Sequence, residues 1–273
     1  LPRLCVQLPS RGRAGTLAAC VRALAAQSLA DADFEVLIGL DGPDPEAERL
    51  ARAVWGERPA QNLRILTFPR QGHLPIRAAL VGMTDAPLLV FMNDDVLAEP
   101  GFLEAHRSAH AEAATSGLAL GAMVVGATPW TVPPSDTLFD RLVRQTGLVF
   151  FYDAMDREVR DHAGAARWRD WGFRHFWTLN ASAPRRAVEA VGGFRAIPET
   201  YGHEDIELAF RLHERFAMPV LYRPEARALH DHRYTPQDVI RREVNLGAAS
   251  WRFARASPAF GQALFGRDIT SED

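Results

Sequence analysis

The sequence predicts an α/β protein with a mostly parallel central sheet flanked by helices. Short apolar runs alternate with helical patterns through the first half of the chain, and these runs are mostly continuous and do not alternate regularly with polar residues. Continuous apolar strands separated by helices are typical of parallel sheets that are covered on both faces. A chain of 273 residues with 47% hydrophobic residues can also bury a sizeable core. In sheets of this kind, ligands bind at the carboxyl ends of the strands.

Each strand of the first half is expected to lead through a polar loop into a helix. The apolar runs that predict strands span residues 4–8, 34–42, 63–68 and 88–96. The patterns that predict the intervening helices span residues 16–27, 45–55, 76–83 and 100–113. Because Asp41 and Asp95 follow the second and fourth strands, both side chains should face one crevice.

A fifth apolar run, at residues 118–127, is expected to extend the sheet before the pattern becomes less regular. Prolines, aromatics and scattered charges mark residues 128–174, with helical patterns at 136–145 and 156–170. We interpret this stretch as an insertion that shapes specificity. Regular patterns then return. Residues 176–194 predict a strand, a short helix and a Gly-Gly turn, and residues 203–216 predict a further helix. One or two short strands are expected at 219–232 and a terminal amphipathic helix at 236–256.

The composition excludes several classes of function. A charged fraction of 24% and a formal net charge of −3 leave no basic stripe for a nucleic-acid backbone. All 31 basic residues are arginines, which excludes lysine Schiff bases and the phosphate-loop lysine. Cys5 and Cys20 form no metal-ligand pattern and are expected to be buried thiols. Because the sequence shows neither a signal-peptide pattern nor an apolar run of about 18 residues, we expect a cytoplasmic location.

Two adjacent carboxylates follow the fourth strand. Asn93, Asp94 and Asp95 come directly after the apolar run LLVFM. An ionised carboxylate at the end of a buried strand is costly unless a positive charge pairs with it. Divalent cations such as Mg²⁺ and Mn²⁺ take oxygen ligands of this kind, often with substrate phosphates completing the shell. The alternative is that these residues cap a helix or form a turn.

Two further pairs of polar residues lie in the second half of the chain. His230 and His232 are two residues apart in LHDH, so both imidazoles of an extended segment would point to one side. One of them could join Asp95 at a metal ion, and the alternative is a structural or exposed pair. Glu204 and Asp205 begin a predicted helix, where acids either complement the helix dipole or serve as a general base.

The motifs, in their order along the chain, resemble those of family 2 glycosyltransferases of the GT-A fold. They are VQLPSRGRAGTLAACVRALAAQSLADADFEVLIGLDG, VFMNDDV, LNASAPRRAVEAVGGF, GHEDIELAFRL and ALHDH, and they cover roughly residues 4–232. The resemblance implies a single-domain, Rossmann-like GT-A sheet with an acceptor-side insertion. It also implies a nucleotide-sugar-binding half, an acceptor-binding and catalytic half, and a C-terminal helix and tail, at residues 1–127, 128–235 and 236–273.

The resemblance further implies roles for individual residues. A nucleoside-diphosphate sugar, such as a UDP-, GDP- or dTDP-sugar, would be bound by Pro9, Ser10, Arg11, Asp41, Arg77, Asn93 and Asp94. Asp95 would bind Mn²⁺ or Mg²⁺ together with His230 or His232, and spacing alone does not choose between the two histidines. Asp205 would be the catalytic base, and Glu204 would orient one of the sugars.

The implied reaction is the metal-dependent transfer of a sugar, with inversion, to a hydroxyl of a glycan, a lipid-linked acceptor or a small molecule. Aromatic residues at 168–177 predict either an acceptor platform or an anchor in the core or a loop. With a nearby histidine, the candidate acceptor-binding residues are Trp168, Trp171, Trp177 and His203. Arginines on the terminal helix form either a solvated face or a peripheral contact with the inner face of an anionic membrane.

Two alternatives differ from this interpretation. A sugar nucleotidyltransferase shares the parallel sheet, but such enzymes rely on a glycine-rich loop and on lysines, which this chain lacks. A non-catalytic nucleotide-sugar-binding module would keep the pocket but not the acids and histidines, whereas Asp95, Asp205 and the LHDH histidines are present.

Overall fold

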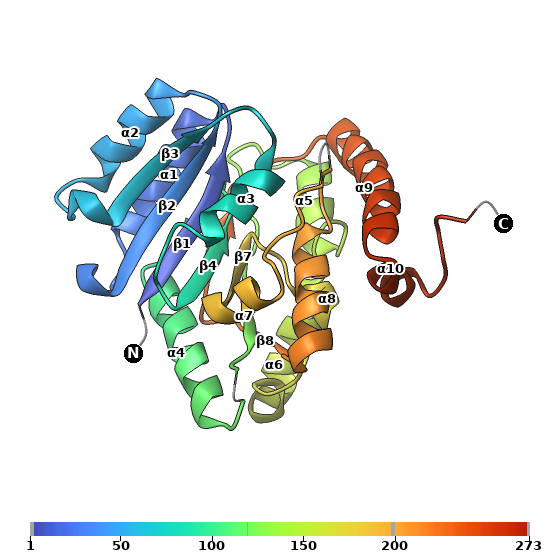
Figure 1. The fold of residues 1–273 in the computed structure, drawn as a ribbon. Coiled ribbons are helices and arrows are strands. Elements are labelled where there is room, and N and C mark those ends of the chain that lie inside the picture. The colour runs from blue at the N-terminus through green and yellow to red at the C-terminus, as the bar shows by residue number, and fades with distance from the viewer. Residues whose placement is uncertain (1–2, 119, 198–199, 272–273) are drawn as a thin grey trace.

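The computed structural model describes residues 3–118, 120–197 and 200–271. The strands of its main sheet are β1 Leu4–Ser10, β2 Phe34–Asp41, β3 Leu63–Phe68, β4 Leu88–Met92, β6 Met123–Gly126, β7 Asn180–Pro184 and β8 Val220–Arg223. Within the described residues they are ordered β3-β2-β1-β4-β7-β6-β8, and helices flank the sheet (Figure 1). β1 to β4 run parallel, β7 runs antiparallel to both β4 and β6, and β6 and β8 are parallel to each other. The predicted mostly parallel sheet is therefore confirmed.

The first-half helices lie where the sequence predicts them, with ends that differ by a few residues. They are α1 Ala14–Ala25, α2 Pro45–Trp55, α3 His73–Val81 and α4 Phe102–Thr115. α1 and α2 pack together, and α3 packs against β1 and β2. A Cβ atom on Gly39 of β2 would collide with Cγ2 of Ile76, so the close approach of α3 requires glycine there. This packing holds α3 against the end of the sheet where the acidic residues gather.

Further helices lie in the second half of the chain. They are α5 Leu138–Gln145, α6 Tyr152–Ala166, α7 Arg185–Ala190, α8 Glu204–Phe216, α9 Pro236–Ala256 and α10 Pro258–Phe265. Single 3₁₀ turns occur at η1 Asp31–Asp33, η2 Ala60–Asn62 and η3 Phe173–His175. α10 is a short helix with proline at its first position that packs against α9, and it was not among the helices predicted from the sequence.

A small second sheet, which the sequence analysis only half anticipated, lies beside the main one. β5, Val96–Ala98, pairs antiparallel with β9, Ala228–His230, and the register places Val96 opposite His230. The backbone N–H of Asp231 also donates to the carbonyl of Asp95 over 2.7 Å. This pairing joins two segments that are more than a hundred residues apart in the sequence.

Two predictions about the remaining chain can be compared with the structure. Cys5 and Cys20 are free and buried, as expected, and burial raises the pKa of both thiols. Over the described ranges, the longest apolar helical stretches fall short of what is needed to cross a membrane.

Candidate active site

A cleft of about 910 Å³ opens at the carboxyl ends of β1, β2 and β4. The predicted donor-binding and metal-binding residues that line it are Pro9, Ser10, Arg11, Asp41, Arg77, Asn93, Asp94, Asp95, His230 and His232. The predicted catalytic and acceptor-binding residues that line it are Glu204, Asp205, Trp177 and His203. Trp168 and Trp171 are not among the described residues of the lining, so the structure does not support an acceptor role for these two.

Asp41 fixes the loop at one end of the cleft. Its Oδ1 accepts hydrogen bonds from the backbone N–H groups of Gln71 at 2.7 Å and Gly72 at 3.2 Å. Its Oδ2 lies 3.6 Å from Nη1 of Arg11, whose side chain is largely exposed. The carboxylate therefore holds the loop before α3 with one oxygen and presents the other toward the cleft.

Asp94 and Asp95 are both buried, and Arg13 bridges them. The hydroxyl of Ser10 donates to Oδ2 of Asp94 over 2.6 Å. The guanidinium of Arg13 pairs through Nη2 with Oδ1 of Asp94 and through Nη1 with Oδ2 of Asp95, the latter at 2.8 Å. Burial raises the pKa of Asp94 more than Arg13 and Ser10 lower it. Sequence reasoning missed Arg13, which stands in the same SRGR loop as the predicted Ser10 and Arg11.

The small sheet brings two imidazoles to Asp95. Nε2 of His230 lies 3.7 Å from Oδ1 of Asp95, and Nδ1 of His232 lies 3.5 Å from Oδ2. Burial disfavours ionisation of Asp95, but the hydrogen bond with His232 and the interactions with His230 and Arg13 hold its pKa below the usual range. Burial lowers the pKa of His230 to about 4, so this imidazole is neutral near pH 7 and can act as a ligand.

Aromatic side chains hold the imidazoles in place. The ring of Trp130 stacks on His230, with centroids 4.2 Å apart and planes at 24°. Tyr234 meets His232 edge-on at 4.4 Å. Metal-binding histidines are usually oriented by a hydrogen bond to the second ring nitrogen. In the described part of the chain Nδ1 of His230 has no such partner, so stacking on Trp130 orients this ring.

The donor atoms around Asp95 fit a divalent cation that shares its ligands with a substrate. Oδ1 of Asp95 is buried, faces His230, and finds no hydrogen-bond partner among the described residues. A carboxylate and a neutral imidazole are suitable ligands for Mn²⁺. Over the same residues, no group of three or more His, Cys, Asp and Glu side chains has the arrangement of a complete metal site. These residues could therefore supply only part of a coordination shell, and phosphate oxygens of a substrate would be chemically matched to complete it.

Arg77 lies between the two acidic pairs of the cleft. It is buried, and its Nη2 donates to Oδ1 of Asn93 over 2.5 Å. Within the described ranges its Nε and Nη1 have no hydrogen-bond partner. Burial lowers the pKa of this guanidinium, whereas the charges of both acidic pairs oppose that shift. Two unpaired N–H groups on a buried cation are suited to an anionic ligand that enters the cleft.

Glu204 and Asp205 begin α8 at the other side of the cleft. Burial and the neighbouring charge of Glu204 raise the pKa of Asp205 to about 7. Asp205 is only half-buried, and its carboxylate accepts from the backbone N–H groups of Ile206 at 2.8 Å and Thr178 at 3.3 Å. Burial raises the pKa of Glu204, but His73, whose Nε2 lies 3.3 Å away, and Arg77 lower it to about 2. The two carboxyls therefore differ strongly in their affinity for a proton.

The residue before this pair has an unusual backbone. His203 adopts φ 67°, a left-handed conformation that costs energy in a residue other than glycine. Its Nε2 lies 2.9 Å from Oγ of Ser250 on α9, so this imidazole links the start of α8 to the terminal helix.

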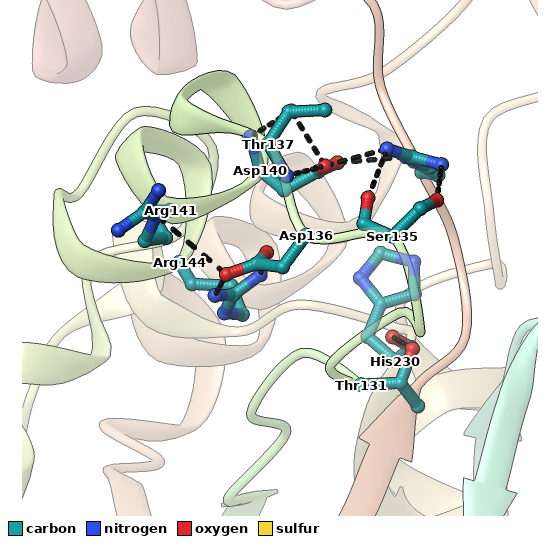
Figure 2. Close-up of polar contacts among 9 residues, drawn as sticks. Thr131, Ser135, Asp136, Thr137, Asp140, Arg141, Arg144 and His230 are labelled. Atoms are coloured by element: carbon teal, nitrogen blue, oxygen red, sulfur yellow. Dashed lines mark hydrogen bonds and ion pairs between the residues drawn. The ribbon is translucent and has the colours of Figure 1, made fainter.

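The segment that follows the histidines is anchored to α5. Arg233 donates through Nε and Nη2 to the two carboxylate oxygens of Asp140 at 2.8 and 2.7 Å. Asp140 also closes a capping box with Thr137 at the start of α5, and Asp136 pairs nearby with Arg144 (Figure 2). The ion pair between Arg233 and Asp140 thus ties the start of this helix to the residue that follows His232.

The terminal helix takes part in the cleft. Two of its arginines, Arg241 and Arg242, line the cleft beside Tyr201 and Leu246. The predicted alternative of a membrane-facing basic surface on α9 therefore gains no support at these two positions.

Comparison with known proteins agrees with this arrangement. The model of the family described as glycosyl transferase family 2 matches residues 5–191. The chain belongs to this family and contains a glycosyltransferase domain of the GT-A type. The nucleotidyltransferase alternative is therefore not carried further.

Two curated relatives are glucosyltransferases. The chain is 30% identical over 226 residues to validoxylamine A glucosyltransferase of Streptomyces hygroscopicus subsp. jinggangensis (strain 5008), which covers 78% of this chain and 52% of that protein. A second validoxylamine A glucosyltransferase, from subsp. limoneus, is also 30% identical, with 48% of its length covered. The chain thus spans about half the length of the curated relatives it matches.

Solved structures share the fold at low sequence identity. The mannosyltransferase PcManGT from Pyrobaculum calidifontis, in complex with GDP-Man and Mn²⁺, has a TM-score of 0.61 and 16% identity, over 93% of this chain and 64% of that one. TarS of S. aureus has a TM-score of 0.58 and 11% identity, over 97% of this chain and 46% of that one.

Proposed function

We propose that the chain transfers a sugar from a nucleoside-diphosphate sugar to a hydroxyl acceptor, with a divalent metal and with inversion at the anomeric carbon. The observation that carries the proposal is that one cleft holds two different acidic sites. Asp94 and Asp95 lie on the side of the cleft where His230 faces Asp95, and a cation fits there. Asp205 lies in the first turn of α8, and its pKa is raised. Glycosyl transfer needs both, because one side must stabilise a leaving phosphate and the other must accept a proton.

The donor is proposed to bind along β1, β2 and β4. The loop at Pro9 to Arg11 and the carboxylate of Asp41 would contact the nucleobase and ribose. The unpaired N–H groups of Arg77 and the positive charge of Arg13 support a pyrophosphate nearby, because both cations line the cleft.

The metal is proposed to bind to Asp95 with His230, and His232 is the second candidate ligand. When bound, Mn²⁺ or Mg²⁺ supplies a Lewis acid that stabilises the negative charge of the leaving nucleoside diphosphate. His230 is the better ligand of the two histidines because it is buried, neutral and fixed by Trp130, and its Nε2 faces the unpaired Oδ1 of Asp95.

Asp205 is proposed to act as the general base. An alcohol is a weak nucleophile near neutral pH, and a carboxylate with a pKa of about 7 is matched to receive its proton during attack. The backbone N–H groups of Ile206 and Thr178 hold the carboxylate in one orientation. Direct attack on the anomeric carbon from the face opposite the leaving phosphate inverts its configuration.

The acceptor is proposed to enter between α8, α9 and the aromatic segment after α5. Trp177 and His203 line this part of the cleft, and Phe150 and Phe151 add apolar surface suited to the face of a sugar ring. The curated relatives are named as glucosyltransferases of validoxylamine A, which supports a hexose donor and a small-molecule acceptor.

A donor screen tests the proposal. Purified protein is incubated with UDP-, GDP- and dTDP-sugars in the presence of Mn²⁺, Mg²⁺ or EDTA, and nucleoside diphosphate release is measured. We expect release from one donor class that depends on the metal and increases when the acceptor is present. Failure of every donor to bind or react with either metal would refute the proposed activity.

A further inference from the structure

Arg13 supplies a positive charge at the place where the proposed metal binds. Asp94 and Asp95 are 1% and 5% exposed, and two adjacent buried carboxylates require a nearby cation. The guanidinium of Arg13 gives one nitrogen to each carboxylate, at 2.8 Å for Asp95. This fork spans both acids in a way that a single point charge cannot.

The two oxygens of Asp95 have different environments. Oδ2 is held by Arg13 and faces His232, whereas Oδ1 faces His230 and has no hydrogen-bond partner among the residues described. A divalent ion that bound between Oδ1 and His230 would lie beside the guanidinium on the same carboxylate. Because like charges repel and Asp95 is buried from solvent, the metal and Arg13 would compete for this carboxylate.

Arg13 can move without disturbing the core. Its side chain is 41% exposed, and it stands at the start of α1 directly after Gly12, which has φ 61°. It also lines the cleft near the predicted donor-binding residues. A donor pyrophosphate in this cleft brings negative charges that can pair with the guanidinium when it leaves Asp95.

We infer that Arg13 is an internal counter-ion that the divalent metal displaces from the Asp94–Asp95 pair and that then binds the donor pyrophosphate. The inference rests on the proposed function, and Arg13 acts in it as a positioning and donor-binding residue. It makes metal and nucleotide binding cooperative, because the nucleotide removes the cation that competes with the metal. If Arg13 only oriented the carboxylates for the metal, its replacement would weaken Mn²⁺ binding. Replacement of a counter-ion that competes with the metal strengthens Mn²⁺ binding.

Metal binding without turnover distinguishes these two roles. Mn²⁺ affinity is measured from the electron paramagnetic resonance signal of free Mn²⁺, first for the protein alone and then with UDP, GDP or dTDP. The proteins are the wild type, Arg13→Gln, Arg13→Lys and the control Arg22→Gln. Arg22 is an exposed arginine on the same helix, so its replacement removes the same charge away from the cleft. Circular dichroism melts show whether each variant is folded.

We expect Arg13→Gln to bind Mn²⁺ alone about tenfold tighter than the wild type, the change that 1.4 kcal/mol produces. Nucleotide should strengthen Mn²⁺ binding by the wild type and by Arg22→Gln, and much less by Arg13→Gln. Arg13→Lys, which keeps the charge without the fork, should fall between. The inference is overturned if Arg13→Gln binds Mn²⁺ no more tightly than the wild type does. It is also overturned if Arg13→Lys and Arg13→Gln have the same Mn²⁺ affinity. A wild type that binds no Mn²⁺ even with nucleotide overturns the metal site itself.

Discussion

Asp95 and His230 meet across the short antiparallel pairing of β5 and β9, with Oδ1 of Asp95 3.7 Å from Nε2 of His230. The register places Val96 opposite His230, so the carboxylate that precedes β5 and the imidazole that ends β9 lie side by side. The geometry of this proposed metal site therefore depends on two strands of three residues each and on the side chains that hold His230.

The stack of Trp130 on His230 should control metal affinity. Trp130→Leu removes this stack. Because Nδ1 of His230 has no hydrogen-bond partner among the described residues, the imidazole of His230 can then rotate away from Asp95. We expect Mn²⁺ affinity to fall about tenfold, in the range found when groups that orient metal ligands are removed. Trp130→Phe should retain most of the affinity. The matched control is Trp168→Leu, because Trp168 is exposed and lies over Arg223 outside the cleft. Equal affinities for Trp130→Leu and Trp168→Leu would contradict this role.

The ion pair between Arg233 and Asp140 should position the same site from the other side. Asp140→Asn removes the charge that anchors the residue after His232, and we expect Mn²⁺ affinity to fall about tenfold. Asp136→Asn is the matched control, since the carboxylate of Asp136 forms its ion pairs with Arg141 and Arg144 of the same helix (Figure 2). Isothermal titration with Mn²⁺ and thermal melts of both variants separate positioning from stability. A similar affinity loss in Asp136→Asn would indicate a general effect of α5.

The local sequence predicts the large elements and the acids but not the contacts that join them. The continuous apolar run at 88–92 predicts a buried strand, and the acids that follow it must face the ligand edge of a parallel sheet. β5 and β9, by contrast, are too short to give a periodic pattern, and their pairing depends on contacts between distant parts of the chain. Spacing therefore identified both histidines without showing which one approaches the unpaired oxygen of Asp95.

Side-chain direction explains the remaining differences. Arg13 and His73 are not singled out by their spacing among the 31 arginines and nine histidines of the chain, yet each contacts an acidic residue of the cleft. Trp168 and Trp171 lie in the same aromatic cluster as Trp177, and composition gives no direction to their rings. Only the packed structure shows that Trp177 faces the cleft.

Loss of the Asp205 carboxylate should affect turnover and leave donor binding intact. We expect Asp205→Asn to lower kcat by a factor of about 10²–10⁴, the usual contribution of a general base. Affinity for nucleotide with Mn²⁺ should be unchanged, because Asp205 lies apart from Asp95 and His230. Glu214→Gln, an exposed carboxylate on the same helix, should retain wild-type turnover. Full activity in Asp205→Asn would show that another group accepts the proton.

The raised pKa of Asp205 should also appear in the pH dependence of stability. The folded chain holds this proton up to about pH 7, whereas an unfolded aspartate releases it near about pH 3.9. The stabilisation is therefore complete below the unfolded pKa and is lost as the pH rises through the folded pKa. Between about pH 5 and 8, the melting temperature of the wild type should fall relative to that of Asp205→Asn, whose amide does not titrate. A constant difference between the two would argue against the shift.

Glu204 should set the pH at which the proposed base becomes active. Asp205 accepts a proton only when it is ionised, so kcat/KM of the wild type should rise with pH and level off above about pH 7. Glu204→Gln removes the adjacent negative charge, which lowers the pKa of Asp205 because an anion is less costly beside a neutral amide. The acidic limb of the profile should then move to lower pH, even if the maximal rate is reduced. The measurement is kcat/KM from about pH 5 to 9 for the wild type, Glu204→Gln and the surface control Glu214→Gln. A Glu204→Gln profile that keeps the wild-type midpoint, or moves to higher pH, would mean that Glu204 does not govern the ionisation of the base.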